Sequence, residues 1–176
     1  SLGLEKEKIT QGINKYTCVP GRLEMFELAT GAKAIIDYAH TPDAYEKVLS
    51  TIKEIMIDAK ANIYIVFGCG GNRDISKRSL MAAIAEKYAT HIFVTPDNPR
   101  YEKLHKINKD IVSGFNKNNF DVFDDREIGL RAALDITLKN DIVIIFGKGR
   151  EEYQEVDGEF ISYSDIKIIN EYSHEN

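Results

Sequence analysis

The sequence IYIVFGCGGNRD, residues 63–74, sets a five-residue apolar run directly before a glycine-rich turn. Similar short runs, rich in β-branched and aromatic residues, occur at residues 34–37, 91–95, 120–123 and 142–146. Several of these runs are apolar at every position, which is typical of strands that helices cover on both faces. Stretches of helical length separate them. This alternation predicts βαβ units on a mostly parallel sheet.

The stretches between the runs carry apolar residues at helical spacing. Thr41 is placed to cap the first predicted helix, and Pro42 suits its first position. The four apolar stripes consist of Tyr45, Val48, Leu49, Ile52, Ile55 and Met56; of Leu80, Met81, Ile84, Ala85 and Tyr88; of Leu104, Ile107, Ile111 and Phe115; and of Leu130, Ala133, Leu134 and Thr137. We interpret all four as core-facing. The predicted fold class is α/β: a Rossmann-like, mostly parallel sheet of about six strands flanked by helices.

The two ends of the chain depart from this alternation. Residues 1–17 hold a short, polar-rich helical pattern with no obvious strand to pack on, and they lead into the sequence VPGR at residues 19–22. Near the other end, residues 153–156 and 159–161 flank Asp157-Gly158, a pair favoured in tight hairpin turns. Ser164 is placed to cap a last helix that runs toward Tyr172. We therefore expect a C-terminal hairpin beside the sheet.

Composition and charge exclude several classes of protein. The 176 residues are 43% hydrophobic and 10% aromatic, enough for a real core rather than a disordered tail. A net charge of -5 argues against non-specific nucleic-acid binding. The longest apolar run, residues 142–146, is far shorter than the roughly 20 residues that cross a bilayer, and the polar start does not resemble a signal peptide. We expect a soluble protein with neither nucleic acid nor membrane as partner.

The two cysteines, Cys18 and Cys69, lie far apart, with no Cys or His cluster around them. This spacing indicates neither a disulfide framework nor a structural zinc site, and the reducing cytoplasm is the expected compartment. Cys69 follows a predicted strand inside the glycine cluster. It is either a reactive thiol or a small residue that packs well, and packing is the commoner role.

Polar segments follow four of the predicted strands. They are DYAHTPD at residues 37–43, GCGGNRD at 68–74, TPDNPR at 95–100 and GKGRE at 147–151. In open parallel sheets ligands bind beyond the carboxyl ends of the strands, so these segments are where a site is expected. Arg73 and Arg100 can each present a planar fork to a carboxylate, while Asp97 and Glu151 can accept from an ammonium group. The set matches a zwitterion; the alternative is a structural ion-pair network among the four.

Other interpretations of these segments stay open. A dinucleotide motif that starts at Gly68 needs a small residue where Arg73 stands, although Asp97 is placed like the acid that binds a ribose. No P-loop is present, because Gly147-Lys148 is followed by Gly149 rather than by Ser or Thr. His40 either binds a ligand or caps its loop. Asp37 either holds a ribose hydroxyl or accepts amides of its own turn.

Six stretches, in this order, resemble the C-terminal domain of the Mur ligases. They are VPGRLEMF at residues 19–26, IDYAHTPD at 36–43, FGCGGNRD at 67–74, DNPR at 97–100, GKGRE at 147–151 and YSD at 163–165. The resemblance spans nearly the whole chain. It implies an ATP-dependent, amide-forming ligase of three domains in which residues 18–176 are the domain for the incoming amino acid. Residues 1–17 then look like the tail of the central ATPase domain.

The resemblance also implies the ligands. The incoming amino acid is meso-diaminopimelate or a close analogue such as lanthionine, and the acceptor is UDP-N-acetylmuramoyl-L-alanyl-D-glutamate, bound by other domains in the cytoplasm. ATP and magnesium are bound mainly by the central domain, so neither catalytic nor metal-binding residues are expected here, and the chain alone should bind without catalysis. The implied substrate-binding residues are Arg73, Asp97, Asn98, Arg100, Gly147 and Glu151. The residues implied to approach the nucleotide are Arg22, Asp37 and His40.

Within the implied site, the arginines take the distal carboxylate of the diamino acid. Asp97, Glu151 and the carbonyl of Gly147 take its distal ammonium group. Lysine has no distal carboxylate, so a site that leaves Arg100 unpaired should reject it.

The sequence departs from the family pattern at three positions. Arg150 stands where a His is usual, and Pro96 stands where an acid or Ser is common. Ser79 stands where the family often has a Pro directly after the pair Lys77-Arg78. A related glutamate ligase domain, of the kind used in folylpolyglutamate or cyanophycin synthesis, would share the fold but lack the DNPR stretch at residues 97–100. A stand-alone dinucleotide-binding module is the second alternative.

Overall fold

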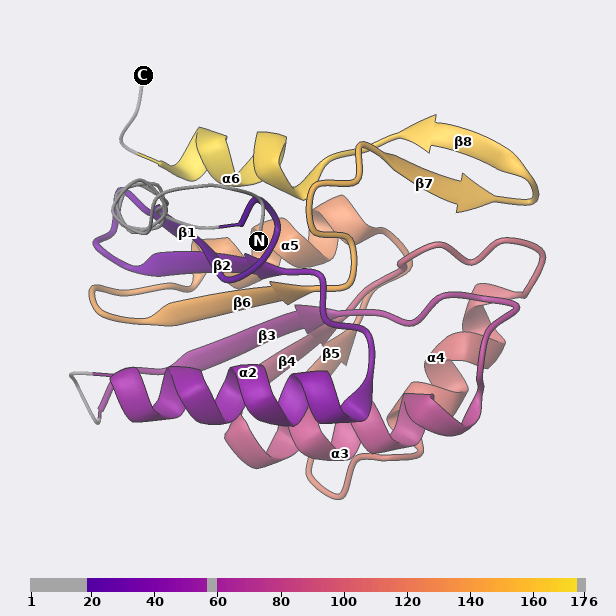
Figure 1. Ribbon diagram of the computed structural model, residues 1–176, viewed down its shortest axis with the longest axis horizontal. Coiled ribbons are helices and arrows are strands. Elements are labelled where there is room, and N and C mark those ends of the chain that lie inside the picture. The colour runs from indigo at the N-terminus through magenta and orange to yellow at the C-terminus, as the bar shows by residue number, and fades with distance from the viewer. Residues whose placement is uncertain (1–18, 57–59, 174–176) are drawn as a thin grey trace, which may run out of the picture.

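A six-stranded sheet forms the centre of the molecule (Figure 1), in a computed structural model that describes residues 19–56 and 60–173. The strand order is β1-β2-β6-β3-β4-β5. The strands are β1 (Glu24–Glu27), β2 (Lys33–Asp37), β3 (Ile63–Phe67), β4 (His91–Val94), β5 (Phe120–Val122) and β6 (Ile142–Phe146). All neighbouring pairs are parallel except β1 and β2, which are antiparallel. This confirms the predicted α/β class with its mostly parallel sheet.

Helices cover both faces of the sheet. The helices α2 (Pro42–Ile55), α3 (Ser76–Tyr88) and α4 (Leu104–Val112) pack on one face, and α5 (Arg126–Asp135) and α6 (Asp165–Tyr172) on the other (Figure 1). Alternate residues of β3 point into the two cores, with Ile65 in the first and Val66 in the second. Every residue of β3 and β6 is buried. The continuous apolar runs in the sequence therefore reflect burial on two faces.

Most predicted boundaries hold within a residue. The Thr41 side chain accepts from the Ala44 amide at 3.3 Å, so it caps α2 as expected. Ser164 does stand at the start of α6, but its side chain makes no capping hydrogen bond. Two residues predicted to face the core do not: Leu80 is 55% exposed and Ile55 is 60% exposed. In α3, Ala82 is buried in the core instead of Leu80.

The edge strand β1 was not predicted. Its sequence is EMFE, and two glutamates in four residues give it little strand propensity. The segment forms a strand because it pairs with β2 along its whole length, from Glu24 opposite Ile36 to Glu27 opposite Lys33. Tertiary pairing has overridden local preference here.

The C-terminal hairpin is confirmed. Strands β7 (Tyr153–Val156) and β8 (Glu159–Ser162) form a separate two-stranded sheet. Asp157 and Gly158 both have positive φ, 50° and 84°, as a tight turn of this kind requires. Figure 1 shows the hairpin projecting beyond the carboxyl ends of the parallel strands.

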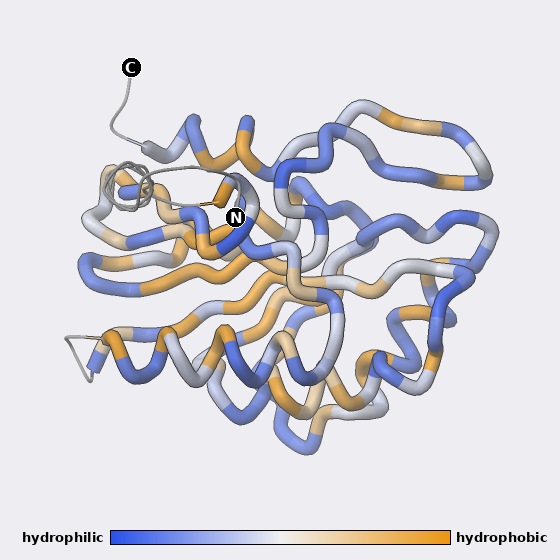
Figure 2. The backbone as a smooth tube through the Cα atoms, viewed as in Figure 1, coloured by the Kyte–Doolittle hydropathy of each residue, from blue (hydrophilic) through white to orange (hydrophobic). Residues whose placement is uncertain are grey.

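The strands and the loops that follow them differ in hydropathy. Figure 2 shows the strands mostly hydrophobic and the loops beyond their carboxyl ends mostly polar or neutral. No helix within the described residues has the length and apolar character needed to span a membrane. Residues 1–17, predicted to be the tail of another domain, and Cys18 lie outside the described part of the chain.

Candidate functional site

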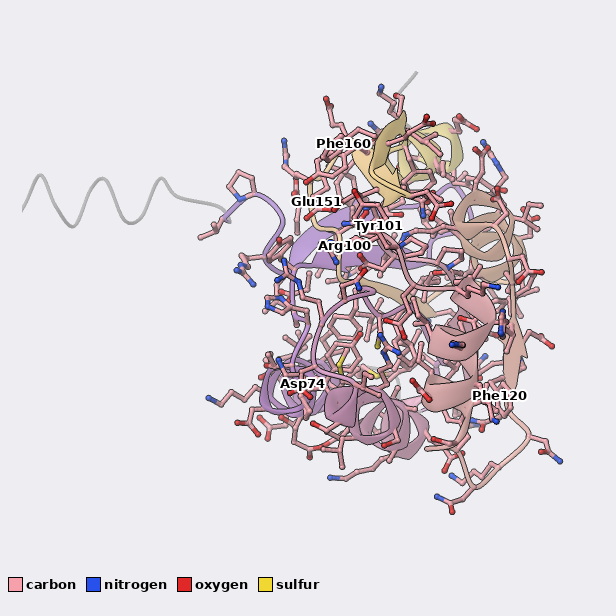
Figure 3. All side chains as sticks on the ribbon, turned by 90° about the vertical axis from the view of Figure 1, so that its right-hand side faces the viewer. Asp74, Arg100, Tyr101, Phe120, Glu151 and Phe160 are labelled. Carbon is pink, nitrogen blue, oxygen red and sulfur yellow. The ribbon has the colours of Figure 1, made fainter. Side chains whose placement is uncertain are left out.

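A cavity of about 480 Å³ opens at the carboxyl ends of the parallel strands. Figure 3 looks onto this edge of the molecule, with Asp74, Arg100 and Glu151 among the labelled side chains. All six residues implied to bind substrate line the cavity, and so does His40. The complete lining consists of Tyr38, His40, Gly68, Cys69, Gly70, Arg73, Asp74, Lys77, Met81, Asp97, Asn98, Arg100, Gly147 and Glu151. Four loops that are distant in sequence thus meet at one place.

The glycine turn after β3 is packed against the loop at residues 95–100. A Cβ atom on Gly68 would lie 2.0 Å from the Thr95 carbonyl oxygen, and one on Gly71 would lie 1.8 Å from that of Pro99. The Gly71 amide donates to the Asn98 carbonyl at 2.9 Å. The glycines therefore admit a neighbouring backbone. Close packing of the two loops therefore accounts for Gly68 and Gly71 without a phosphate ligand.

Arg100 is held firmly at the rim of the cavity. Its backbone lies in the left-handed region, with φ at 54°. The guanidinium forms an ion pair from Nε to Glu155 Oε2 at 2.9 Å and donates from Nη1 to the Gly71 carbonyl at 3.0 Å. Nη2 makes no hydrogen bond to any described residue. One nitrogen of the fork thus stays available to a ligand.

Arg73 lies on the α3 side of the same cavity. Its side chain is exposed, and within residues 19–56 and 60–173 it forms neither a hydrogen bond nor an ion pair. Among the described residues, the alternative of an ion-pair network among Arg73, Arg100, Asp97 and Glu151 is therefore wrong. Arg100 does form an ion pair, but with Glu155, which lies outside that set.

Among the acids that line the cavity, Asp97 has the fewest partners in the described part of the chain. Its half-buried carboxylate lines the cavity, and a Cβ atom on Gly147 would lie 2.5 Å from its Oδ2 atom. No hydrogen bond or ion pair to this carboxylate occurs among the described residues. Burial raises the pKa of the Asp97 carboxyl, while the charges of Arg126 and Lys148 act in the opposite direction. A ligand ammonium group would supply the partner that this carboxylate lacks.

Glu151 belongs to a tight polar network with Asn98 and Lys148. The Lys148 ammonium is fully buried and donates to Asn98 Oδ1 at 2.9 Å and to Glu151 Oε2 at 3.2 Å. Asn98 Nδ2 donates to Glu151 Oε2 at 3.1 Å, and the Tyr38 hydroxyl donates to Oε1 at 3.1 Å. Burial lowers the pKa of Lys148. The network fastens the loop at 95–100 to the loop at 147–151, so Glu151 also has a structural role.

Lys148 was missed by the sequence analysis, which weighed it only as part of a P-loop. Its buried position depends on Asn98 and Glu151 folding over it, and Asn98 is 50 residues away. The available signal was weak: a lysine between two glycines, directly after a fully apolar strand.

A fully buried ion pair lies at the carboxyl ends of β4 and β6. Arg126 donates to both carboxylate oxygens of Asp165, from Nε at 2.9 Å and from Nη2 at 2.8 Å. It also donates to the Phe146 carbonyl at 3.0 Å and to Thr95 Oγ1 at 3.2 Å. The Tyr163 hydroxyl donates to Asp165 Oδ1 at 2.7 Å. This arrangement joins the ends of β4 and β6 and explains the YSD stretch at residues 163–165.

The residues implied to approach the nucleotide lie around Tyr38. The Arg22 guanidinium stands over the Tyr38 ring, 5.1 Å from its centroid, and the His40 ring meets the same ring edge-on at 5.4 Å. Asp37 is buried, and its two oxygens accept from the amides of Leu23 and Ala39 at 2.9 and 2.8 Å. Asp37 thus accepts backbone amides, as one of its two interpretations predicted. Contact of Asp37 with a nucleotide remains a prediction.

Two further positions from the sequence analysis are settled by packing. Arg150, which replaces the usual His, forms an ion pair with Glu24 of β1 and does not line the cavity. Cys69 is buried, and burial raises the pKa of its thiol to about 12, so it is a packing residue rather than a reactive thiolate. Among the described residues, no three His, Cys, Asp or Glu side chains gather closely enough to hold a metal ion.

Comparison with known proteins identifies relatives of the whole chain. The family model described as "Mur ligase, glutamate ligase domain" matches residues 21–149. A protein from Haemophilus influenzae (strain PittGG) named UDP-N-acetylmuramoyl-L-alanyl-D-glutamate--2,6-diaminopimelate ligase is 39% identical over 98% of this chain and 35% of its own length. A Bacillus cereus protein of the same name is 40% identical over 96% of this chain and 34% of its own. The chain thus spans about a third of the length of these relatives.

Solved structures give the same picture. A structure entitled UDP-N-acetylmuramoyl-L-alanyl-D-glutamate--2,6-diaminopimelate ligase superposes with a TM-score of 0.79 at 32% identity, over 97% of this chain and 34% of that one. A bifunctional folylpolyglutamate synthase/dihydrofolate synthase from Yersinia pestis has a TM-score of 0.64 at 22% identity, over 84% of this chain and 32% of that one. The second match reflects a shared fold alone.

Proposed function

We propose, because this chain belongs to the Mur ligase family, that it is the amino-acid-binding domain of an ATP-dependent ligase. The ligase would join meso-diaminopimelate to UDP-N-acetylmuramoyl-L-alanyl-D-glutamate, in the cytoplasm, during the synthesis of peptidoglycan precursors. The chain's share in that reaction is to hold the distal end of the diamino acid so that its other amine is presented for attack on the activated carboxyl group.

One observation carries this proposal. An unpartnered carboxylate, Asp97, and an unpaired guanidinium, Arg73, line the same cavity. Burial makes the unpartnered Asp97 carboxylate costly to keep charged, whereas the Arg73 guanidinium is exposed and hydrated, and its fork is available to a ligand carboxylate. A ligand that carries an ammonium and a carboxylate pairs with both groups. The distal carbon of diaminopimelate bears one ammonium and one carboxylate. The arrangement therefore fits an amino acid better than a simple acid or amine.

Arg100 and the Glu151 network add selectivity. Arg100 Nη2 offers a second donor to the carboxylate, and Glu151 and the Gly147 carbonyl line the side where the ammonium would lie. Lysine supplies an ammonium but leaves both arginines without a carboxylate. A charge-assisted hydrogen bond contributes about 1.5–3 kcal/mol, so we expect lysine to bind at least about tenfold more weakly.

ATP and magnesium are assigned to parts of the ligase outside this chain. Gly68 and Gly71 are accounted for by packing against the loop at 95–100, and the sequence contains no P-loop. Arg22 and His40, both exposed beside Tyr38, are the groups that would approach the nucleotide from this side. We therefore derive no catalytic step from this chain.

Calorimetric titration of this chain with meso-diaminopimelate and with L-lysine tests the proposal. We expect binding of meso-diaminopimelate, at least about tenfold weaker binding of lysine, and loss of this difference in Arg73→Ala. Arg131→Ala is the matched control, because it removes a guanidinium from α5, away from the cavity. Equal affinity for the two ligands, or no binding of either at millimolar concentration, would contradict the proposal.

Two additions sharpen the result. Lanthionine presents the same two ends on a spacer that contains sulfur. Comparing its affinity with that of meso-diaminopimelate shows whether the cavity discriminates between spacers as well as between end groups. Incubating the chain with ATP, magnesium, meso-diaminopimelate and the muramoyl dipeptide should yield no amide product. Turnover above background would refute the division of roles between this chain and the rest of the ligase.

A further inference from the structure

We propose that Glu155 is a positioning residue for Arg100 and that the β7–β8 hairpin sets the selectivity of the cavity for a ligand with a distal carboxylate. This inference rests on the proposed function, in which Arg100 meets that carboxylate. Glu155 does not line the cavity. Its effect on a ligand is therefore exerted through the side chain that it holds.

The hairpin grips Arg100 through both backbone and side chain. The Arg100 amide donates to the Glu155 carbonyl at 2.9 Å, and the Asp157 amide donates to the Arg100 carbonyl at 2.8 Å. The Glu155 carboxylate also forms an ion pair with Arg100, with 2.9 Å between Oε2 and Nε. The Glu155 amide also donates to Asn98 Oδ1 at 3.0 Å. One hairpin strand thus fixes two residues of the DNPR loop.

This grip maintains a backbone conformation that Arg100 does not adopt readily by itself. A left-handed φ at a residue other than glycine is strained and persists where its surroundings enforce it. The next residue is also fitted to the hairpin, since a Cβ atom on Gly158 would lie 2.6 Å from the Tyr101 hydroxyl. Figure 3 shows Arg100 and Tyr101 together on the side where Phe160 of β8 lies. The hairpin therefore determines where the guanidinium is.

Glu155 also determines which edge of the guanidinium faces the ligand. With Nε bound to Glu155 and Nη1 to the Gly71 carbonyl, the terminal Nη2 is the nitrogen left for a carboxylate. An arginine side chain without the Nε contact has several rotamers of similar energy, and ordering it on binding reduces affinity. The contact is an ion pair, and no Nε–H hydrogen bond to Glu155 is present among the described residues, so its effect on the guanidinium depends on the charge of Glu155.

The first test compares the affinities of the chain for meso-diaminopimelate and lysine in three variants. In Glu155→Ala we expect the preference for meso-diaminopimelate to fall at least about fivefold, while lysine affinity stays within about twofold. Glu155→Gln removes the charge and should lower the preference as well. Glu159→Ala is the matched control, because it removes a glutamate from the same hairpin that has no contact with Arg100. If Glu155→Ala does not fold, Glu155→Gln replaces it, since glutamine keeps the length of the side chain and lacks only the charge.

A second readout needs no ligand. In nitrogen-15 NMR spectra, the chemical shift of Arg100 Nε should change in Glu155→Ala and in Glu155→Gln, which both remove the ion pair, but not in Glu159→Ala. An unchanged Arg100 Nε shift in Glu155→Ala, or an unchanged preference for meso-diaminopimelate in that variant, would overturn the inference. A chain whose Arg100 Nε signal shifts in Glu155→Ala, but whose wild type shows no preference, would instead refute the proposed function and leave the Glu155 contact standing.

Discussion

Replacing Arg126 by methionine removes a buried guanidinium from the carboxyl ends of β4 and β6 and should lower the free energy of unfolding by about 3–5 kcal/mol. The side chains of Arg126 and Asp165 are both 0% exposed in this ion pair. Without Arg126, the Asp165 carboxylate keeps only the Tyr163 hydroxyl as a partner, and the Phe146 carbonyl loses a donor. Breaking one side of a buried pair leaves an uncompensated charge, which is the source of this large cost.

Urea unfolding, followed by circular dichroism, measures this cost. Arg131→Met is the matched control: Arg131 pairs with Glu127 and Glu171 at 2.8 and 2.7 Å, but it is partly exposed, so its loss should cost no more than about 1 kcal/mol. Combining Arg126→Met with Asp165→Asn removes the buried charge, and the double variant should be more stable than the sum of the single changes predicts, by roughly 2 kcal/mol. If Arg126→Met costs no more than Arg131→Met, the ion pair does not hold the ends of β4 and β6 together.

Three further predictions concern the cavity and its supports. Asp97→Asn should abolish ligand binding and raise the melting temperature at pH 7. Burial raises the pKa of the Asp97 carboxyl, so the wild-type fold loses stability as pH rises through that pKa. At pH 3 the carboxyl is protonated, and the variant and the wild type should melt at the same temperature. Gly71→Ala should lower the free energy of unfolding by roughly 2–3 kcal/mol, since its Cβ would lie 1.8 Å from the Pro99 carbonyl oxygen. If urea unfolding gives this variant the same free energy of unfolding as the wild type, the two loops are not in contact. Arg78 lowers the pKa of Glu102 to about 2, so this pair contributes stability that is complete above about pH 4.5 and is lost as pH falls toward 2. Chemical unfolding across that range should show a smaller loss of stability in Glu102→Gln, and identical slopes would disprove the link.

The sequence was sufficient for the elements that are defined by local pattern. The apolar runs at residues 63–67 and 142–146 became strands with the predicted bounds, and Asp157-Gly158 became the predicted turn. These signals are local: periodicity is read within a few residues, and a tight turn depends on the φ preferences of two. The position of the polar segments at one edge followed from the parallel order of the strands.

The missed features depend on contacts between residues far apart in the chain. Arg126 and Asp165 are 39 residues apart, and Glu155 stands in a hairpin whose contact with Arg100 has no trace in either local sequence. The same limit applies to Glu151, because its three donors come from three different segments. The sequence shows which of these side chains are acidic and which are basic, but not which of them pair with one another.

A crystal structure with meso-diaminopimelate bound tests the dipolar cavity most directly. The account predicts that one end of the ligand lies at the carboxyl edge of the sheet, with its carboxylate on Arg73 and Arg100 and its ammonium on Asp97. A ligand seated elsewhere, or one whose ammonium faces the arginines, would contradict it.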